Sequence, residues 1–230
     1  MNTDWIIRKG ACDAVLFFSG WGMDRRIADH IARTARAESE YDVVAFHDYR
    51  TGNIEAATYD ALAGYRKRTV VAWSFGVWAA AHAKLPAVSY AIAVNGTLSP
   101  VCRETGIDPA VFQVTLNTYN EENRIRFNRR MCGDGEVLDH FISVQPLRTP
   151  ACQKEELAAF AGRIQSVLPE QGVEEFRYDH VIIGGRDMIF PASRQFAAWK
   201  GCSQTVIANM PHYPFFHLAG LEEVLECSRE

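Results

Sequence analysis

One serine in this sequence has neighbours of the kind that accompany a nucleophile. Residues 70–80 read VVAWSFGVWAA, so Ser74 follows a run of apolar residues typical of a buried strand and precedes residues typical of a helix. A nucleophilic serine at such a junction lies in the motif G-x-S-x-G, on a tight and strained turn. Here Ala72 replaces the first glycine and Gly76 keeps the second, which adds one methyl group where strand and helix nearly touch. The alternative is an ordinary hydroxyl at a strand–helix junction.

A serine hydroxyl is a weak nucleophile unless a base accepts its proton and an acid orients that base. The candidate acid is Asp187 in IIGGRDMIFP, and the candidate base is His212 in IANMPHYPFFH, just beyond the last predicted strand. The order Ser, Asp, His is that of the α/β-hydrolase fold. Two histidines compete: His217 lies where a final helix should begin, and His180 should lie at the N-terminal end of its strand. A solvated loop aspartate is the alternative for Asp187.

The oxyanion of a tetrahedral intermediate requires two backbone N–H donors. Phe75, directly after the serine, is expected to supply one of them, and Trp21 in FFSGWGMD the other. Gly20 and Gly22 flank Trp21 and would let its N–H turn toward a substrate. The alternative is a glycine-rich turn that only leaves the strand. A phosphate-binding loop is excluded, because the spacing fits neither GxGxxG nor GxxxxGK[ST]. Together these stretches predict a serine hydrolase.

Short apolar runs that alternate with helical segments must position these residues. The predicted strands, continuous in apolar and β-branched residues, are 14–20, 41–46, 68–74, 89–96, 179–185 and 202–208. The predicted helices between them are 24–39, 53–67 and 76–85. Continuous apolar strands that alternate with helices predict a mostly parallel sheet covered on both faces, and with the serine motif an α/β-hydrolase fold.

One long segment interrupts this alternation. Residues 97 to about 175 contain little strand-like sequence but several helical stretches, including EENRIRFNRRMC and KEELAAFAGRIQSVL. We expect a helical cap inserted after the fourth predicted strand, within a single domain over residues 1–230. A separate second domain is the alternative, but no Gly/Ser/Pro linker flanks the segment.

The overall composition is that of an ordinary soluble domain. The 230 residues are 48% hydrophobic and 23% charged, and the formal charge of −4 gives no reason to expect nucleic acid. No apolar run approaches the roughly 20 residues of a membrane-spanning helix, and MNTDWIIRKG lacks the pattern of a secretory signal, so a cytoplasmic protein is expected. The six cysteines have no metal-ligand spacing, which favours reduced thiols over disulfides or zinc. We expect neither a metal nor a cofactor.

Four stretches resemble a known family: FFSGWGMD, AWSFGVW, GGRDMIFP and PHYPFFH. They look like those of the BioG family of pimeloyl-acyl-carrier-protein methyl ester esterases, which is similar in function to the BioH esterase. The resemblance implies a step of biotin biosynthesis, in which a methyl ester is hydrolysed to pimeloyl-carrier protein and methanol. By position it implies these site residues: nucleophile Ser74, base His212, acid Asp187, oxyanion hole Trp21 and Phe75. In RFNRRMCG it implies that Phe127 contacts the acyl chain.

An acidic carrier protein would need a basic patch on this acidic chain. Four arginines fall within seven residues of a predicted cap helix: Arg124, Arg126, Arg129 and Arg130. If the cap folds them nearby, Arg103 and Arg148 could extend this patch. The alternative is a solvated helix face partly neutralised by the acidic residues Glu121, Glu122 and Asp134.

Two other enzymatic activities and one non-enzymatic function remain open. The same residues would serve a general short-acyl carboxylesterase or a thioesterase, because both reactions pass through an oxyanion. A catalytically silent α/β-hydrolase fold could act as a binding module. The polar cluster FHDYR at 46–50 is interpreted as structural, with Asp48 and Arg50 paired, since Asp48 precedes the serine and has the wrong order for the acid.

Overall fold

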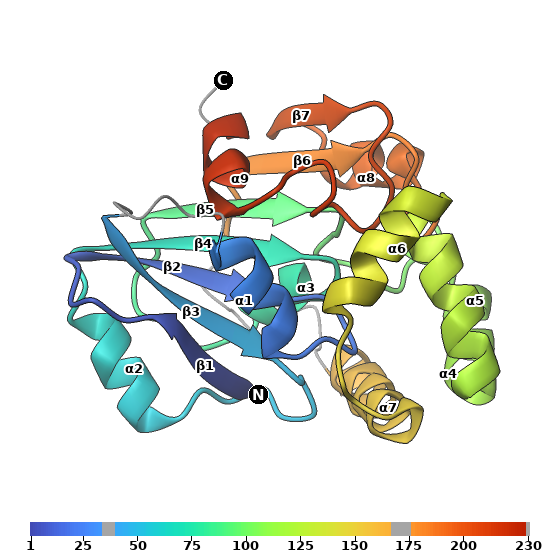
Figure 1. The fold of residues 1–230 in the computed structure, drawn as a ribbon, viewed down its shortest axis with the longest axis horizontal. Helices are drawn as coiled ribbons and strands as arrows, with labels where there is room; N and C mark the ends of the chain where they lie inside the picture. The colour runs from blue at the N-terminus through green and yellow to red at the C-terminus, as the bar shows by residue number, and fades with distance from the viewer. Residues whose placement is uncertain (34–39, 167–175, 229–230) are drawn as a thin grey trace.

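A single sheet of seven strands runs through the computed structural model, which describes residues 1–33, 40–166 and 176–228. The strand order is β1-β3-β2-β4-β5-β6-β7, with β1 antiparallel to β3 and all other neighbours parallel (Figure 1). The strands are β1 Asn2–Ile7, β2 Asp13–Phe18, β3 Tyr41–His47, β4 Lys67–Trp73, β5 Tyr90–Val94, β6 His180–Gly184 and β7 Ser203–Ile207. The predicted mostly parallel α/β sheet is confirmed.

The apolar runs identified the inner strands but not the edge strand β1. β2, β4, β5 and β6 are buried at nearly every position in their C-terminal halves, as strands covered on both faces must be. β1 has the sequence NTDWII and is only partly buried, so it lacks the continuous apolar pattern of the inner strands. β5 is shorter than predicted, because Asn95 follows it with a φ of 46° and ends the strand.

Helices cover both faces of the sheet. α1 and α9 lie in front of it in Figure 1, and α3 lies behind it. Outside the insertion the helices are α1 Arg25–Arg33, α2 Ala56–Ala63, α3 Phe75–Ala81, α8 Ala192–Ala198 and α9 Leu221–Cys227. Of the helix expected over 24–39, the part 34–39 lies outside the described residues.

Among the described residues, four helices lie between β5 and β6, at the C-terminal ends of the parallel strands (Figure 1). They are α4 Pro109–Thr118, α5 Glu121–Cys132, α6 Gly135–Val144 and α7 Pro150–Ser166. The side chains of Asp108, Asn120 and Asp134 each accept a backbone N–H in the first turn of α4, α5 and α6. These N-caps fix where the three helices begin. α5 has the bounds of the predicted stretch EENRIRFNRRMC, and the predicted residues 167–168 after α7 lie outside the described residues.

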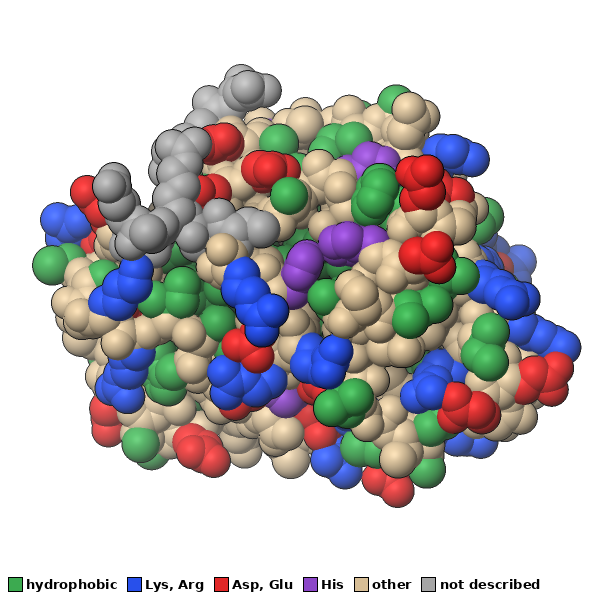
Figure 2. All heavy atoms as spheres, viewed as in Figure 1, with side chains coloured by type: hydrophobic (Ala, Val, Ile, Leu, Met, Phe, Trp, Pro, Cys, Tyr) green, Lys and Arg blue, Asp and Glu red, His purple; other side chains and the backbone are tan. Residues whose placement is uncertain are grey.

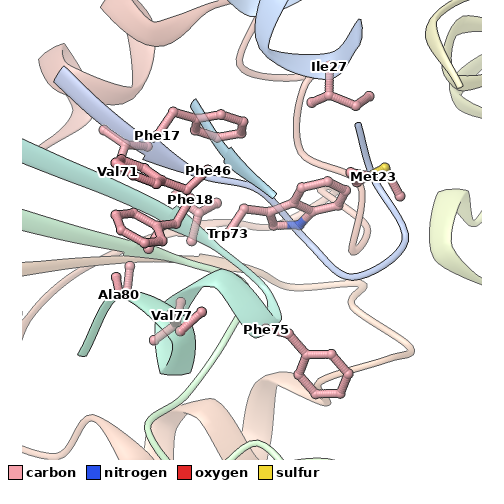
Figure 3. Packing of buried hydrophobic residues seen from close by; sticks show 14 of the residues in the cluster. Phe17, Phe18, Met23, Ile27, Phe46, Val71, Trp73, Phe75, Val77 and Ala80 are labelled. Atoms are coloured by element: carbon pink, nitrogen blue, oxygen red, sulfur yellow. The ribbon is translucent and has the colours of Figure 1, made fainter. Parts of the chain in front are cut away.

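The core fills both sides of the sheet. Figure 3 shows Val77 and Ala80 of α3 on one side and Ile27 of α1 on the other. Phe18 and Phe46 stack with their ring centroids 4.4 Å apart. This packing fixes the ends of β2 and β4, from which the loops of the site emerge.

Among the described residues, no helix is both long enough and apolar enough to cross a bilayer.

Candidate active site

Ser74 lies on a strained turn between β4 and α3. Its φ of 60° and ψ of −125° fall in a region that residues with a Cβ rarely adopt. The turn is crowded, because a Cβ on Gly76 would lie 2.3 Å from the carbonyl oxygen of Phe18. Ala72 is not at such a contact; it lies inside the sheet, paired with Phe18 and Ala93. The fold therefore requires glycine at position 76, two residues after the serine, and accepts the methyl group of Ala72, two residues before it.

Ser74, His212 and Asp187 form a buried chain of hydrogen bonds. His212 Nε2 lies 2.9 Å from Ser74 Oγ, and His212 Nδ1 lies 2.8 Å from Asp187 Oδ2. The three residues are exposed to 5%, 2% and 6% respectively. The structure thus brings together three residues that are far apart in the sequence, in an arrangement where the imidazole can accept the serine proton and the carboxylate can orient the imidazole.

A glutamine that the sequence analysis missed helps to hold Asp187. Asp187 Oδ1 accepts the backbone N–H groups of Ile189 and Phe190 at 2.7 and 2.8 Å. The side chain of Gln195, on α8, donates Nε2–H to Asp187 Oδ2 at 3.1 Å and to the carbonyl of Phe190 at 2.7 Å. The ring of Phe190 also stacks on His212, with centroids 5.7 Å apart. These contacts leave Asp187 little freedom to turn.

The loop that carries His212 is held from two neighbouring strands. Trp73 Nε1–H donates to the His212 carbonyl at 2.9 Å. Asn95 donates Nδ2–H to the carbonyls of Pro211 and His212 at 2.8 and 3.1 Å, and its Oδ1 accepts the N–H of Gly184 at 2.7 Å. The sequence does contain a signal for this residue: Asn before Gly at a strand end tolerates the positive φ that points the amide inward.

The loop after β2 lies against the serine turn. A Cβ on Gly20 would lie 3.4 Å from the Cβ of Ser74. Within the part of the chain that the structure describes, the N–H of Trp21 has no hydrogen-bond acceptor. The N–H of Phe75 is among the first of α3, which have no acceptor within a helix. Two backbone donors are therefore available beside Ser74.

A largely apolar pocket opens above Ser74. Its floor is formed by Trp21, Ser74, Phe75 and His212. The insertion supplies most of its walls, among them Ile107, Val111, Phe112, Phe127, Met131 and Leu157. The predicted substrate contact Phe127 packs edge-on against Trp21, with centroids 5.3 Å apart. The pocket therefore presents a largely apolar surface directly beside the serine.

The four arginines of α5 do not form one free patch. Arg124 pairs with Glu121 and donates to the carbonyl of Arg148, and Arg126 pairs with Glu122. Arg130 lines the pocket, where its Nε–H donates to the Met188 carbonyl at 2.9 Å. Arg129 is exposed and, among the described residues, has no ion-pair partner. Figure 2 shows basic and acidic side chains interspersed where α4 and α5 lie.

The expectation that Arg148 could extend this patch is wrong. Its side chain is only 10% exposed, and its guanidinium pairs with Glu156 and Asp48 inside the protein. Arg103 is exposed and lies 3.5 Å from Asp108. A buried guanidinium with two carboxylate partners is not available to an acidic surface.

The other polar residues considered in the sequence lie outside the hydrogen bonds that join Ser74, His212 and Asp187. Asp48 and Arg50 do pair, with contacts of 2.6 and 2.8 Å. His180 begins β6 and contacts the hydroxyls of Ser203 and Thr205, at the end of the sheet opposite Ser74. His217 takes no part in the hydrogen bonds that join Ser74 to Asp187, which run through His212. In the described ranges no group of three or more His, Cys, Asp or Glu side chains is placed to hold a metal ion.

The parallel sheet with its helical covering, together with the serine turn, places this chain in the class of α/β-hydrolases. Residues 1–224 match the family described as pimeloyl-ACP methyl esterase BioG, and the chain belongs to that family. The crystal structure of BioG from Haemophilus influenzae superposes with a TM-score of 0.85 at 27% identity, over 97% of this chain and 99% of that one. A malonyl-[acyl-carrier protein] O-methyltransferase of Bacteroides fragilis is 38% identical over a match of 206 residues that covers 87% of this chain.

These likenesses differ in what they show. The chain spans only 39% of the length of the Bacteroides protein. An esterase from Exiguobacterium antarcticum superposes with a TM-score of 0.62 at 15% identity, over 99% of this chain and 92% of that one. At that identity the likeness shows the fold alone. The family and the fold are therefore established.

Proposed function

We propose that this chain is a serine carboxylesterase that hydrolyses the methyl ester of pimeloyl-acyl-carrier protein, giving pimeloyl-carrier protein and methanol in biotin biosynthesis. The observation that carries the proposal is the buried chain from Ser74 through His212 to Asp187 at the floor of an apolar pocket. The description of the family supports the substrate.

The reaction follows from the positions of these groups. His212 Nε2 accepts the proton of Ser74 as Oγ attacks the ester carbonyl, and Asp187 stabilises the imidazolium that forms. The oxyanion accepts hydrogen bonds from the N–H groups of Trp21 and Phe75. The intermediate collapses, His212 returns the proton to the leaving methoxide, and methanol departs. Water then attacks the acyl-enzyme by the same steps and releases the carboxylic acid.

The pocket suits the acyl chain of this substrate. Its walls are mainly aliphatic and aromatic, and each methylene buried there contributes about 0.8 kcal/mol. In this proposal Phe127 contacts the acyl chain of the substrate. Arg126 and Arg129, on the exposed face of α5, contact the acidic carrier protein. The carrier protein lies outside the pocket and presents only its acyl arm to Ser74.

The name of the Bacteroides relative describes a methyl transfer, which is the formation of such an ester rather than its hydrolysis. That name belongs to a protein of which this chain matches 39%. Methyl transfer to a carboxylate needs no activated serine, whereas ester hydrolysis uses each of the three hydrogen-bonded residues. The site therefore supports hydrolysis.

Genetic complementation tests the substrate. The gene is introduced into a strain that needs biotin because it lacks its pimeloyl esterase. We expect growth without biotin from the wild-type gene and none from the Ser74→Ala variant at equal protein levels. If soluble wild-type protein hydrolyses small esters but fails to restore growth, the substrate is wrong and a general short-acyl esterase or thioesterase is favoured.

A further inference from the structure

The loop that carries Trp21 is fastened to helix α7 of the insertion by buried polar side chains. Residues 19–24 connect β2 to α1 and have no regular secondary structure. Gly22 in this loop has a φ of 77°. A donor on such a loop stabilises an oxyanion only if its N–H already points at the place where the charge develops. Something outside the loop must therefore fix its orientation.

Two side chains of α7 hold Gly22 from both sides. Glu156 Oε2 accepts the N–H of Gly22 at 3.1 Å, and Gln153 Nε2–H donates to the carbonyl of Gly22 at 2.9 Å. The backbone carbonyl of Gln153 also accepts the indole N–H of Trp21 at 2.7 Å. The two peptide groups that flank the α-carbon of Gly22 are thereby fixed, and one of them follows Trp21 directly.

Glu156 is itself held in place. Its side chain is fully buried, and Oε1 accepts the N–H of Tyr49 at 2.9 Å. Arg148 donates to Glu156 Oε2 at 2.5 Å and to the carbonyl of Met23 at 3.2 Å. Burial raises the pKa of Glu156, and Arg148 opposes that rise. The guanidinium thus reaches the same loop one residue beyond Gly22.

A buried ion pair adds little to stability compared with apolar residues of the same size, because both charges lose their hydration. Here the ion pair of Glu156 and Arg148 instead fixes orientation. The N–H groups of Gly22 and Tyr49 and the guanidinium of Arg148 all donate to the Glu156 carboxylate, which holds the loop beside Ser74. An apolar replacement could fill the space but could not orient the peptide groups of Gly22.

We propose that Glu156 and Gln153 are positioning residues that orient the N–H of Trp21 as an oxyanion donor. This inference rests on the proposed function. The insertion then has a second task besides forming the wall of the pocket, because its helix α7 determines whether the oxyanion hole is formed.

The test compares two α7 variants with a matched control. Glu156→Gln keeps the shape of the side chain but places an amide NH₂ against one of the three donors, and Gln153→Met removes the contact with Gly22 at similar volume. The control is Asp42→Asn: Asp42 is also a fully buried carboxylate and accepts the N–H of Lys9 at 2.7 Å and the hydroxyl of Tyr65 at 2.7 Å. It lies near the start of β3, away from the strand ends that carry the site.

The assay is hydrolysis of p-nitrophenyl butyrate, with active sites counted by titration with a phosphonate ester. We expect Glu156→Gln to lower kcat per titrated site by about 10- to 100-fold and to leave KM within about twofold, as a displaced oxyanion donor does. The inhibition constant of a trifluoromethyl ketone, which forms an oxyanion on the serine, should rise by the same factor. Gln153→Met should act in the same direction, and it decides the question if Glu156→Gln does not fold. Asp42→Asn should keep the wild-type kcat per site.

Wild-type kcat per titrated site in both α7 variants would overturn this inference, and so would a loss of kcat matched by Asp42→Asn. If hydrolysis depends on Ser74 but not on the α7 residues, only this inference fails. If the wild-type protein hydrolyses no ester in a manner that depends on Ser74, the proposed function fails and this inference fails with it.

Discussion

At the scale of single residues, the serine turn tolerates a methyl group on one side and not on the other. A Cβ on Gly76 would lie 2.3 Å from a backbone oxygen of β2, and backbone cannot move aside as a flexible side chain can. Ala72 lies within the regular sheet, where its methyl group is fully buried among neighbours. The departure from G-x-S-x-G therefore occurs at the position where the fold can accommodate it.

We expect Gly76→Ala to destabilise the protein far more than Ala72→Gly. Gly76→Ala forces β2 and α3 apart. Ala72→Gly removes one methyl group and gives the unfolded chain more conformational freedom, which lowers the free energy of unfolding by about 1 kcal/mol. Urea unfolding of the two variants and the wild type measures the free energies. Equal decreases in the free energy of unfolding of the two variants would show that the close contact at Gly76 does not determine which residues the turn accepts.

Sequence reasoning could find Ser74, Asp187 and His212 because their types, order and position at strand ends follow from the chemistry. It could not find Gln195, because nothing in the local pattern of a short helix shows that one glutamine points inward. The burial of Arg148 could not be predicted for a related reason, because it depends on Glu156 and Asp48, which only the fold brings next to this side chain.

At the scale of elements, α5 carries the four arginines of the predicted patch, of which Arg126 and Arg129 are exposed and do not line the pocket. Its bounds could be predicted because Asn120 caps it and its composition is helical. How α5 packs against the other helices could not be predicted, because no periodicity in its sequence shows which of its faces contacts α6. The exposed arginines Arg126 and Arg129 remain candidates for docking a carrier protein, whereas Arg130 is part of the pocket wall.

Charge reversal on this face should weaken docking without affecting the chemistry. For the double variant Arg126→Glu and Arg129→Glu we expect KM for the carrier-bound ester to rise about 10-fold, because complementary charge mainly assists encounter. KM for p-nitrophenyl butyrate should not change. The matched control reverses Lys67 and Lys84, two exposed lysines outside the insertion. An equal rise in KM from the control variant, or an equal effect on both substrates, would exclude specific docking.

At the scale of the whole molecule, the edge strand β1 was the part of the sheet that the sequence did not predict, whereas the other edge strand, β7, was predicted. β1 is half polar and, among the strands that the structure describes, pairs with β3 alone, so its pattern resembles that of a surface segment. Each inner strand contains a continuous apolar run, and that run predicted where the strand lies in the sequence. The predicted single domain over 1–230, with the insertion as a cap, stays a prediction.

Burial of histidines connects the stability of the whole molecule to pH. Burial lowers the pKa of five histidines below 6.5: His30, His82, His140, His180 and His217. The folded chain therefore resists protonation that the unfolded chain accepts. As the pH falls below about 6.5, the unfolded state binds more protons and the free energy of unfolding decreases.

Thermal unfolding should accordingly occur at a lower temperature at about pH 5.5 than at about pH 7.5. His30 and His140 meet between α1 and α6 with centroids 4.9 Å apart, so His140→Gln should reduce the difference between the two temperatures. Circular dichroism melts of the two proteins at both pH values measure it. An unchanged melting temperature across this range would contradict the lowered pKa values of these partly or fully buried histidines.

The measurement that tests the central claim most directly is the release of methanol from the methyl ester of pimeloyl-acyl-carrier protein by the wild type and by Ser74→Ala. The account predicts rapid release by the wild type and a loss of about 10⁴-fold or more in kcat/KM for the variant, because His212 then has no hydroxyl to activate. Both proteins should melt at similar temperatures, so that the loss is chemical. Wild-type rates from Ser74→Ala, or no methanol from the folded wild type, would contradict the proposed function.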